Sequence, residues 1–221
     1  ACLGLALSLV SLGKEVSVFL EKYTEKYDFV PGGELLIYES PKNLKFDLFI
    51  SLDCGDKERL GTASLISENI KTVNIDHHVS NSYFGDLNYV EPEASSTSEI
   101  IFKLLDGHMP VGKETALALY VGILNDTGGF RHSNVSPYTF FAASKLLTYD
   151  IPASEVYNRL FHKRTLSEAK AMSKAIENAK TVLDGKVIYS YLTMEQLLEC
   201  GANYKQLDGI VEYLKGIIGT E

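Results

Sequence analysis

One uninterrupted apolar run constrains the fold of this 221-residue chain more than any other feature. The segment Leu48-Phe49-Ile50-Ser51-Leu52 shows no polar alternation, which is typical of a strand covered on both faces and hence of a parallel sheet. A second strand is expected over 72–75, with a helix over 57–69 between the two strands. This β-α-β order predicts an α/β fold, in which a parallel sheet carries helices on both faces.

Further elements are expected on either side of this unit. Before it, we expect a helix over 2–12, a strand over 16–20 and a strand over 35–38. After it the pattern becomes helical, and helices are expected to begin near residues 96, 115, 137, 153 and 165. Ser96 and Glu99 have the spacing of a reciprocal capping box. Strands over 182–183 and 187–192 should form a hairpin across Asp184-Gly185, and a last helix is expected over 209–215.

Composition excludes several classes of protein. The chain has 21 Lys and Arg against 29 Asp and Glu, a net charge of −8, which argues against binding to long nucleic acid. No apolar stretch approaches the ~20 residues of a membrane span. The three cysteines lie far apart in the sequence, which indicates reduced thiols and a cytoplasmic protein. Short anionic substrates remain open if metal ions supply positive charge.

Polar residues follow both central strands directly. Asp53 follows the first strand and Asp76-His77-His78 follows the second, so both groups should face one crevice at the carboxyl ends of the strands. Asp126 ends a predicted helix, where a carboxylate is unfavourable unless a cation lies nearby. Carboxylates with imidazoles and no thiolate suit Mn²⁺ or Mg²⁺ and tolerate Zn²⁺ or Fe²⁺. Two such ions could hold the attacking and leaving oxygens of a phosphoryl displacement.

Each of these residues has a simpler explanation when taken alone. An Asp after a strand is commonly a turn residue, and neighbouring histidines on a strand point to opposite faces. The combination of the Asp-His-His triplet with Asp53 upstream and Asp126 downstream favours a metal site.

The motifs resemble those of the DHH phosphoesterases. The stretch Ile75-Asp76-His77-His78 is similar to the family signature, 51–56 to the motif that precedes it, and 122–131 to a later motif, in family order. The resemblance implies that Asp53 bridges two metal ions and that His77 and Asp126 each bind one. It also implies that His78 faces the scissile phosphate, and we predict His78 and Asp76 as the catalytic residues. The expected cofactor is two divalent ions, Mn²⁺ first, with Mg²⁺ or Co²⁺ as alternatives.

The resemblance also implies a domain organisation. Residues 1–180 would form the DHH catalytic domain, and 181–221 a linker and the beginning of a smaller, DHHA1-type substrate-binding domain. The family's first motif, a His and two Asp that complete the set of metal ligands, precedes the helix expected over 2–12. Its Gly-rich and His motif follows the helix over 209–215. We therefore expect a chain truncated at both ends that binds metal poorly and turns over slowly.

Within the family, segments 94–99 and 130–134 resemble the nanoRNase and 3′-phosphoadenosine 5′-phosphate (PAP) phosphatase group. This resemblance implies hydrolysis of RNAs of two to five nucleotides to mononucleotides, and release of phosphate from PAP. The expected partners are short RNA and nucleotides, without a membrane, and a homodimer is left open. Arg131 could pair with a terminal phosphate, and backbone donors near Ser96 could hold phosphate. A solvated arginine and a plain helix cap explain these two residues equally well.

Two alternatives remain open. One is a cyclic dinucleotide phosphodiesterase of the same family, acting on c-di-AMP or pApA, which would use the same metals but need room for a closed ring. The other is a non-catalytic nucleotide-binding module, which the missing first motif would support if the truncation were natural.

Overall fold

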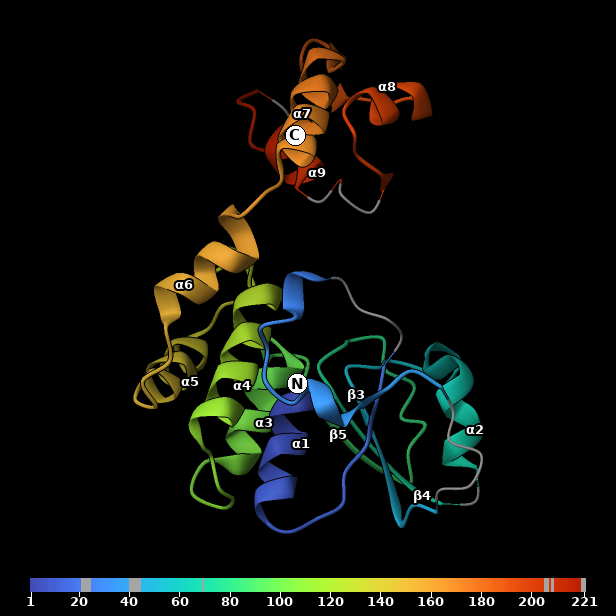
Figure 1. The fold of residues 1–221 in the computed structure, drawn as a ribbon, viewed down its shortest axis with the longest axis vertical. Coiled ribbons are helices and arrows are strands. Elements are labelled where there is room, and N and C mark those ends of the chain that lie inside the picture. The colour runs from blue at the N-terminus through green and yellow to red at the C-terminus, as the bar shows by residue number, and fades with distance from the viewer. Residues whose placement is uncertain (21–24, 40–44, 69, 205–206, 208, 220–221) are drawn as a thin grey trace. The chain divides into compact units, whose positions relative to one another are not determined.

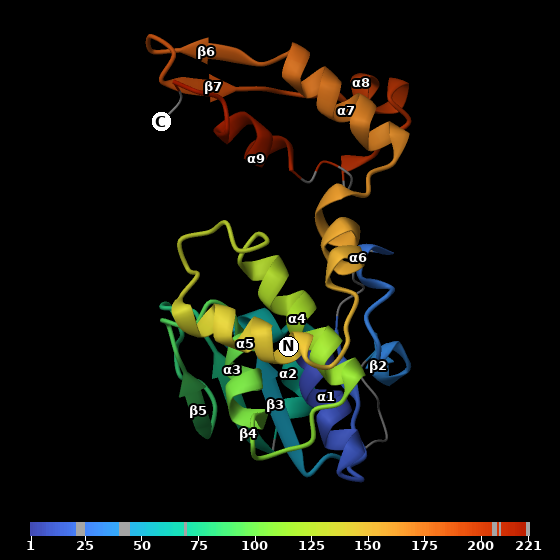
Figure 2. The ribbon, with the colours of Figure 1, turned by 90° about the vertical axis from the view of Figure 1, so that its left-hand side faces the viewer.

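The computed structural model describes the whole chain except residues 21–24, 40–44, 69, 205–206, 208 and 220–221 (Figures 1 and 2). The chain forms two compact units, Ala1–Phe161 and His162–Glu221. The domains predicted from the family resemblance, 1–180 and 181–221, are a different division and stay a prediction. In the described part of the chain, no helix combines the length and apolar character needed to cross a membrane.

The first unit is built on a parallel sheet, as the sequence predicts. Its strands are β3 (Leu48–Leu52), β4 (Lys71–Asp76) and β5 (Leu87–Val90), in the order β3-β4-β5. In this register Leu52 lies opposite Ile75, so β3 and β4 end side by side. The short strands β1 (Val18–Phe19) and β2 (Leu36–Ile37) form a separate parallel pair. The mixed α/β class with parallel pairing is therefore confirmed.

The expected burial of β3 on both faces is wrong. Within the strand only Ser51 is buried, and Leu48 is 47% exposed. The reason is that β3 pairs with β4 alone among the described strands, so it lies at an edge of the sheet. An apolar run of five residues indicates a strand, but it does not report how completely each face is covered.

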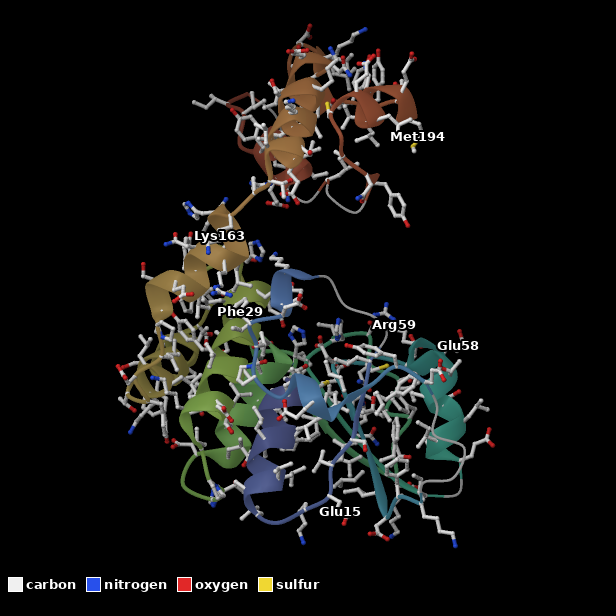
Figure 3. The ribbon with its side chains drawn as sticks, in the orientation of Figure 1. Glu15, Phe29, Glu58, Arg59, Lys163 and Met194 are labelled. Atoms are coloured by element: carbon white, nitrogen blue, oxygen red, sulfur yellow. The ribbon has the colours of Figure 1, made fainter. Side chains whose placement is uncertain are left out.

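The single helix predicted over 57–69 is also wrong. Residue 69 lies outside the described residues, and the rest of the segment contains the 3₁₀ helix η3 (Glu58–Ala63) and the single-turn helix α2 (Ser64–Ser67). The interruption lies at Gly61, whose φ of 54° and ψ of −131° are outside the helical region. Glycine adopts such angles without the steric cost that a Cβ imposes. Figure 3 marks Glu58 and Arg59 on η3.

Four longer helices supply most of the core. They are α1 (Cys2–Ser11), α3 (Thr97–Leu105), α4 (Lys113–Asp126) and α5 (Pro137–Leu147). Figure 1 shows the strands of the sheet between α2 on one side and α1, α3 and α4 on the other. The fully buried apolar side chains lie mainly where α3 and α4 pack, and they include Ile100, Ile101, Leu105, Leu119, Ile123 and Leu124. Their burial is the main stabilising contribution to the unit.

The remaining segments of this unit are short. They are the 3₁₀ helices η1 (Glu25–Tyr27) and η2 (Gly33–Leu35), helix α6 (Ala153–Tyr157) and the π-helical turn η4 (Asn158–His162), which ends at the division between the units.

The second unit begins with α7 (Leu166–Glu177), whose N-cap Thr165 forms a capping box with Glu168. The predicted hairpin follows as the antiparallel strands β6 (Lys180–Val182) and β7 (Val187–Tyr189). Its turn contains Asp184 and Gly185 at positive φ, as Asp-Gly turns require. Helices α8 (Met194–Glu199) and α9 (Ile210–Lys215) complete the described elements.

Candidate metal centre

The candidate site begins where β3 ends. Asp53, the first residue after the strand, has a φ of 59°, in the left-handed region that non-glycine residues rarely adopt. Its backbone N–H donates to the Ile75 carbonyl at 3.1 Å, which continues the ladder between β3 and β4 by one bond. Aspartate tolerates this conformation better than most residues, and strained backbone of this kind is found most often at functional sites.

The ends of β3 and β4 bring one carboxylate and two imidazoles together. The His77 Nε2 lies 3.4 Å from the Asp53 Oδ1, and the His78 Nδ1 lies 4.0 Å from the same oxygen. One potential ligand atom from each residue lies within 4.8 Å of the others. The sequence pattern therefore predicted correctly that these two strand ends would meet.

Asp53 and His77 shift each other's pKa. The hydrogen bond from His77 lowers the pKa of Asp53 to about 2, although burial opposes this shift, and the Thr97 hydroxyl lowers it further. The same hydrogen bond raises the pKa of His77 above its ordinary value, against the effect of burial. Without an ion, the pair therefore consists of a carboxylate and an imidazole that readily takes a proton. A divalent cation would take the place of that proton.

A backbone contact fixes which nitrogen of His77 faces Asp53. The His77 Nδ1 lies 3.3 Å from the Ala94 carbonyl oxygen. Because a carbonyl only accepts, Nδ1 carries the hydrogen and Nε2 is the atom available to a cation. Metal-binding histidines commonly show this arrangement.

Asp76 lies outside this group but contacts two of its members. It is fully buried and accepts hydrogen bonds from the His77 backbone N–H at 2.8 Å, the His78 Nδ1 at 2.7 Å and the Asn81 Nδ2 at 2.6 Å. Burial raises the pKa of Asp76, but these three hydrogen bonds outweigh it and leave the pKa below its ordinary value. The contacts favour a positioning role for Asp76, which holds His78, over the catalytic role expected from the sequence.

Asp126 is the last residue of α4 and lies near the other candidates. Burial raises its pKa, the charge of Asp53 raises it further, and His77 lowers it. The charges of Asp53 and His77 therefore both act on the Asp126 carboxylate. It does not belong to the group whose ligand atoms lie within 4.8 Å of one another, which consists of Asp53, His77 and His78.

The two predicted phosphate contacts have different surroundings. Arg131 is exposed, in the turn after α4 where Gly128, Gly129 and Phe130 all have positive φ. Ser96 is fully buried, and its Oγ caps α3 by accepting from the Glu99 backbone N–H at 3.0 Å. The predicted capping box is wrong in its other half, because the Glu99 carboxylate accepts from the Ser95 hydroxyl at 2.5 Å instead. The phosphate-binding roles stay predictions.

Sequence reasoning missed three residues that hold the candidate ligands. The Thr97 Oγ1 donates to the Asp53 Oδ1 at 2.8 Å, Asn81 binds Asp76, and the Asn134 Nδ2 donates to the Asp126 carbonyl at 3.2 Å. A usable signal was present for Thr97, because it lies in a run of polar residues, Ser95–Glu99, directly before an apolar helix. Asn134 lies in the segment 130–134 that resembles the nanoRNase group, but no contact was assigned to it, and Asn81 gave no signal.

The donor set fits a hard or borderline divalent cation. It offers carboxylate oxygen and imidazole nitrogen, which suit Mn²⁺, Mg²⁺ or Zn²⁺. The nearest thiol in the sequence, Cys54, is buried and donates to the Asp56 carbonyl at 3.0 Å. The Asp53 side chain is 45% exposed, so an ion could reach it from solvent.

Comparison with known proteins gives matches over most of the chain. Residues 1–123 match the DHH family, N-terminal domain. The "Probable bifunctional oligoribonuclease and PAP phosphatase NrnA" of Streptococcus mutans is 38% identical over 112 residues, which are 50% of this chain and 36% of that protein. The "Bifunctional oligoribonuclease and PAP phosphatase NrnA" of Bacillus subtilis is 30% identical over 176 residues, 77% of this chain and 56% of that protein.

A solved structure is also similar. The exopolyphosphatase-related protein from Bacteroides fragilis superposes with a TM-score of 0.91 at 25% identity, over 98% of this chain and 68% of that chain. The chain thus spans from about a third to just over half of the two curated relatives.

Proposed function

Because the chain belongs to the DHH family of phosphoesterases, we propose that it hydrolyses short oligoribonucleotides of two to five nucleotides to mononucleotides, and that it removes phosphate from PAP. The observation that carries this proposal is the convergence of Asp53, His77 and His78 at the ends of β3 and β4. The names of the relatives supply the substrate classes. Since the chain spans only part of those relatives, the activity of the whole protein is a proposal as well.

In this proposal Asp53, His77 and Asp126 hold two divalent ions, with Mn²⁺ as the first candidate. When bound, such ions lower the pKa of water and neutralise charge that develops on the phosphoryl oxygens. The carboxylate of Asp53 is ionised at any physiological pH, because its pKa is about 2. The Nε2 of His77 is directed to the same place by its Nδ1 contact with Ala94.

His78 contacts the phosphate of the substrate in this proposal. Its Nδ1 donates to Asp76, so its Nε2 is the ring atom left to face the scissile phosphate. With both ring nitrogens protonated, its Nε2–H would donate a hydrogen bond to a non-bridging oxygen and stabilise the negative charge that grows on that oxygen. Arg131 would pair with a terminal phosphate, which favours substrates whose end lies near the cleaved bond.

The domain organisation is part of the proposal. Residues 1–180 would supply the catalytic domain, and residues 181–221 would begin a DHHA1-type domain that binds the substrate. The parallel β3-β4-β5 sheet with α1–α5 supports the first assignment. The unit His162–Glu221, with its hairpin β6-β7, gives weaker support to the assignment of residues 181–221.

The proposal is tested with the chain as it stands, at high protein concentration and with long incubations. A labelled RNA dinucleotide, PAP, a long RNA and c-di-AMP are each incubated with Mn²⁺ or with EDTA. We expect mononucleotides from the dinucleotide and phosphate from PAP in Mn²⁺ only. Asp53→Ala should abolish both reactions.

The matched control is Asp56→Ala, which removes a carboxylate from the same loop. Asp56 pairs with Arg59 at 3.4 Å on the surface and is not part of the ligand group. Cleavage of c-di-AMP with no action on the linear dinucleotide would establish the cyclic dinucleotide phosphodiesterase instead. Binding of nucleotides without turnover in any metal would support the non-catalytic module.

A further inference from the structure

The segment Ala94–Thr97, which leads from β5 into α3, is buried although three of its four residues are polar. Ser95 and Ser96 are fully buried and Thr97 is 1% exposed. Polar groups are buried in this way only when they make hydrogen bonds. Ser95 and Ser96 use their hydroxyls locally, on Glu99. The Ser96 carbonyl and the Ala94 N–H also bond locally, to the first turn of α3 and to Glu91. Three other groups of the segment, the Thr97 hydroxyl and the Ala94 and Ser95 carbonyls, bond to residues that are distant in sequence.

The first bond leads to Asp53. The Thr97 hydroxyl donates to the Asp53 Oδ1 at 2.8 Å, across 44 residues of sequence. Asp53 is in the left-handed region, so its carboxylate is presented from a backbone that needs support from its neighbours. A hydroxyl fixed on the first turn of α3 restricts the rotation of that carboxylate.

The second bond leads to His77, and a third reaches the neighbourhood of Asp126. The Ala94 carbonyl accepts from the His77 Nδ1 at 3.3 Å. The Ser95 carbonyl accepts from the Asn134 Nδ2 at 2.8 Å, and the same Nδ2 lies 3.2 Å from the Asp126 carbonyl oxygen. The segment thus contacts Asp53 and His77 directly, and it is linked through Asn134 to the backbone of Asp126 at the end of α4.

We propose that the 94–97 segment fixes the positions of Asp53, His77 and Asp126 before any ion binds, and that Thr97 and Asn134 are positioning residues for divalent-cation binding. The inference rests on the metal site of the proposed function. Groups that orient metal ligands commonly change metal affinity 10–100-fold when removed. The energetic reason is that the free protein already holds the ligands in the geometry that the ion requires.

The test measures Mn²⁺ affinity rather than turnover. Free Mn²⁺ is titrated by electron paramagnetic resonance against the wild-type chain, Thr97→Val and Thr97→Ser, with circular dichroism and thermal melting as checks of folding. Valine keeps the shape of threonine and removes only the hydroxyl. We expect Thr97→Val to weaken Mn²⁺ binding at least about tenfold and Thr97→Ser to restore affinity to within about threefold of wild type. Asn134→Ala should cause a smaller loss, because Asn134 is exposed and acts on a backbone oxygen.

The matched control is Thr139→Val, the same substitution at another buried threonine of this unit. Thr139 belongs to the capping box of α5, and its hydroxyl accepts a hydrogen bond from the Ser136 backbone N–H at 3.0 Å. Thr139→Val should lower the melting temperature and leave Mn²⁺ affinity unchanged. If Thr97→Val bound Mn²⁺ as tightly as wild type, or if both valine variants weakened binding equally, the positioning role would be overturned.

These outcomes are separable from the failure of the proposed function. A wild-type chain that binds Mn²⁺ while Thr97→Val binds it equally well overturns this inference alone. A wild-type chain that binds no Mn²⁺ overturns both the inference and the ion requirement of the proposed function. Hydrolysis of the dinucleotide in EDTA would also overturn the ion requirement of the proposed function, independently of the Mn²⁺ titration.

Discussion

The Nδ1 of His78 lies 2.7 Å from the Oδ1 of Asp76, and this contact leaves Nε2 as the ring nitrogen that is available to a substrate. Asp76 is fully buried and ionised, so it can only accept, and His78 must donate from Nδ1. Asn81 holds the other oxygen of the same carboxylate at 2.6 Å. The orientation of His78 is therefore set from inside the protein and not by the substrate.

Asp76→Asn is expected to impair turnover without preventing ion binding. The amide can present a donor to His78 in place of an acceptor, which would leave the ring in the wrong tautomer. We expect kcat to fall about 10–100-fold, the range typical of groups that orient active-site histidines, with Mn²⁺ affinity within about threefold of wild type. Steady-state kinetics and a Mn²⁺ titration measure the two quantities. Asp86→Asn is the control, because the Asp86 Oδ2 also accepts a backbone N–H, that of Thr72, outside the ligand group.

Cation affinity is expected to rise with pH. The hydrogen bond to Asp53 raises the pKa of His77 above 6.5, so below that raised pKa a proton occupies the nitrogen that a cation needs. The apparent Kd for Mn²⁺ should therefore fall by up to about tenfold per pH unit up to the raised pKa, and level off above it. Calorimetric titrations from about pH 6 to about pH 8 would show this change. An affinity that is constant across the range would contradict a protonated His77.

In the ion-free chain, the contribution of His77 to stability should decrease as the pH rises, whereas cation affinity increases. Because the folded pKa of His77 is raised, its contribution is complete below the unfolded value of 6.5 and is lost as the pH rises through the raised pKa. Because the pKa of Asp53 is lowered from 3.8 to about 2, its contribution is present above 3.8 and is lost as the pH falls toward 2. The pair should therefore stabilise the fold most between these limits.

This pH dependence is measured by thermal melting in EDTA, with wild type compared against His77→Asn. The Asp53 side chain is 45% exposed, so solvent screening limits the difference to below about 1 kcal/mol. His108→Asn, at an exposed histidine outside the ligand group, is the control. A His77→Asn difference that grew above the raised pKa would have the wrong sign for an ion pair.

Gly122→Ala should destabilise the packing of α3 against α4. A Cβ at Gly122 would lie 1.9 Å from the Ser98 Oγ and 2.8 Å from the Ser98 Cβ, so the two helices would have to separate. Overpacking of this kind costs about 1–3 kcal/mol, read as a lower denaturation midpoint in urea. At Gly33 an added Cβ meets no atom within 4 Å, so Gly33→Ala should change the midpoint little. Equal stability of the two variants would mean that the helices tolerate the contact.

The part of the site that sequence predicted depends on a short-range rule. Residues that directly follow neighbouring parallel strands meet, and Leu52 opposite Ile75 brings Asp53 to His77. The position of Asp126 could not be derived in this way, because it depends on how α4 is rotated and packed. Its role as a metal ligand stays a prediction. Thr97 reaches Asp53 across 44 residues, and no local pattern encodes such a pairing.

The fold shows the same limit. Periodicity and turn residues predicted the parallel strands, the helix starts at Ser96 and Thr165 and the Asp184-Gly185 hairpin, because each depends on adjacent residues. Periodicity alone missed the break at Gly61, whose backbone angles no neighbouring residue dictates. It also overestimated the burial of Leu48, which depends on strands that the run itself does not specify.

The left-handed backbone at Asp53 has a consequence for how this protein would lose function. Glycine relieves the steric cost at that position and asparagine tolerates it, so either replacement would leave a chain that folds and accumulates normally. Such alleles would lose little more stability than the small contribution of the Asp53–His77 pair, so a screen that reads abundance or solubility would pass them. Only an assay of ion occupancy or catalysis would reveal them.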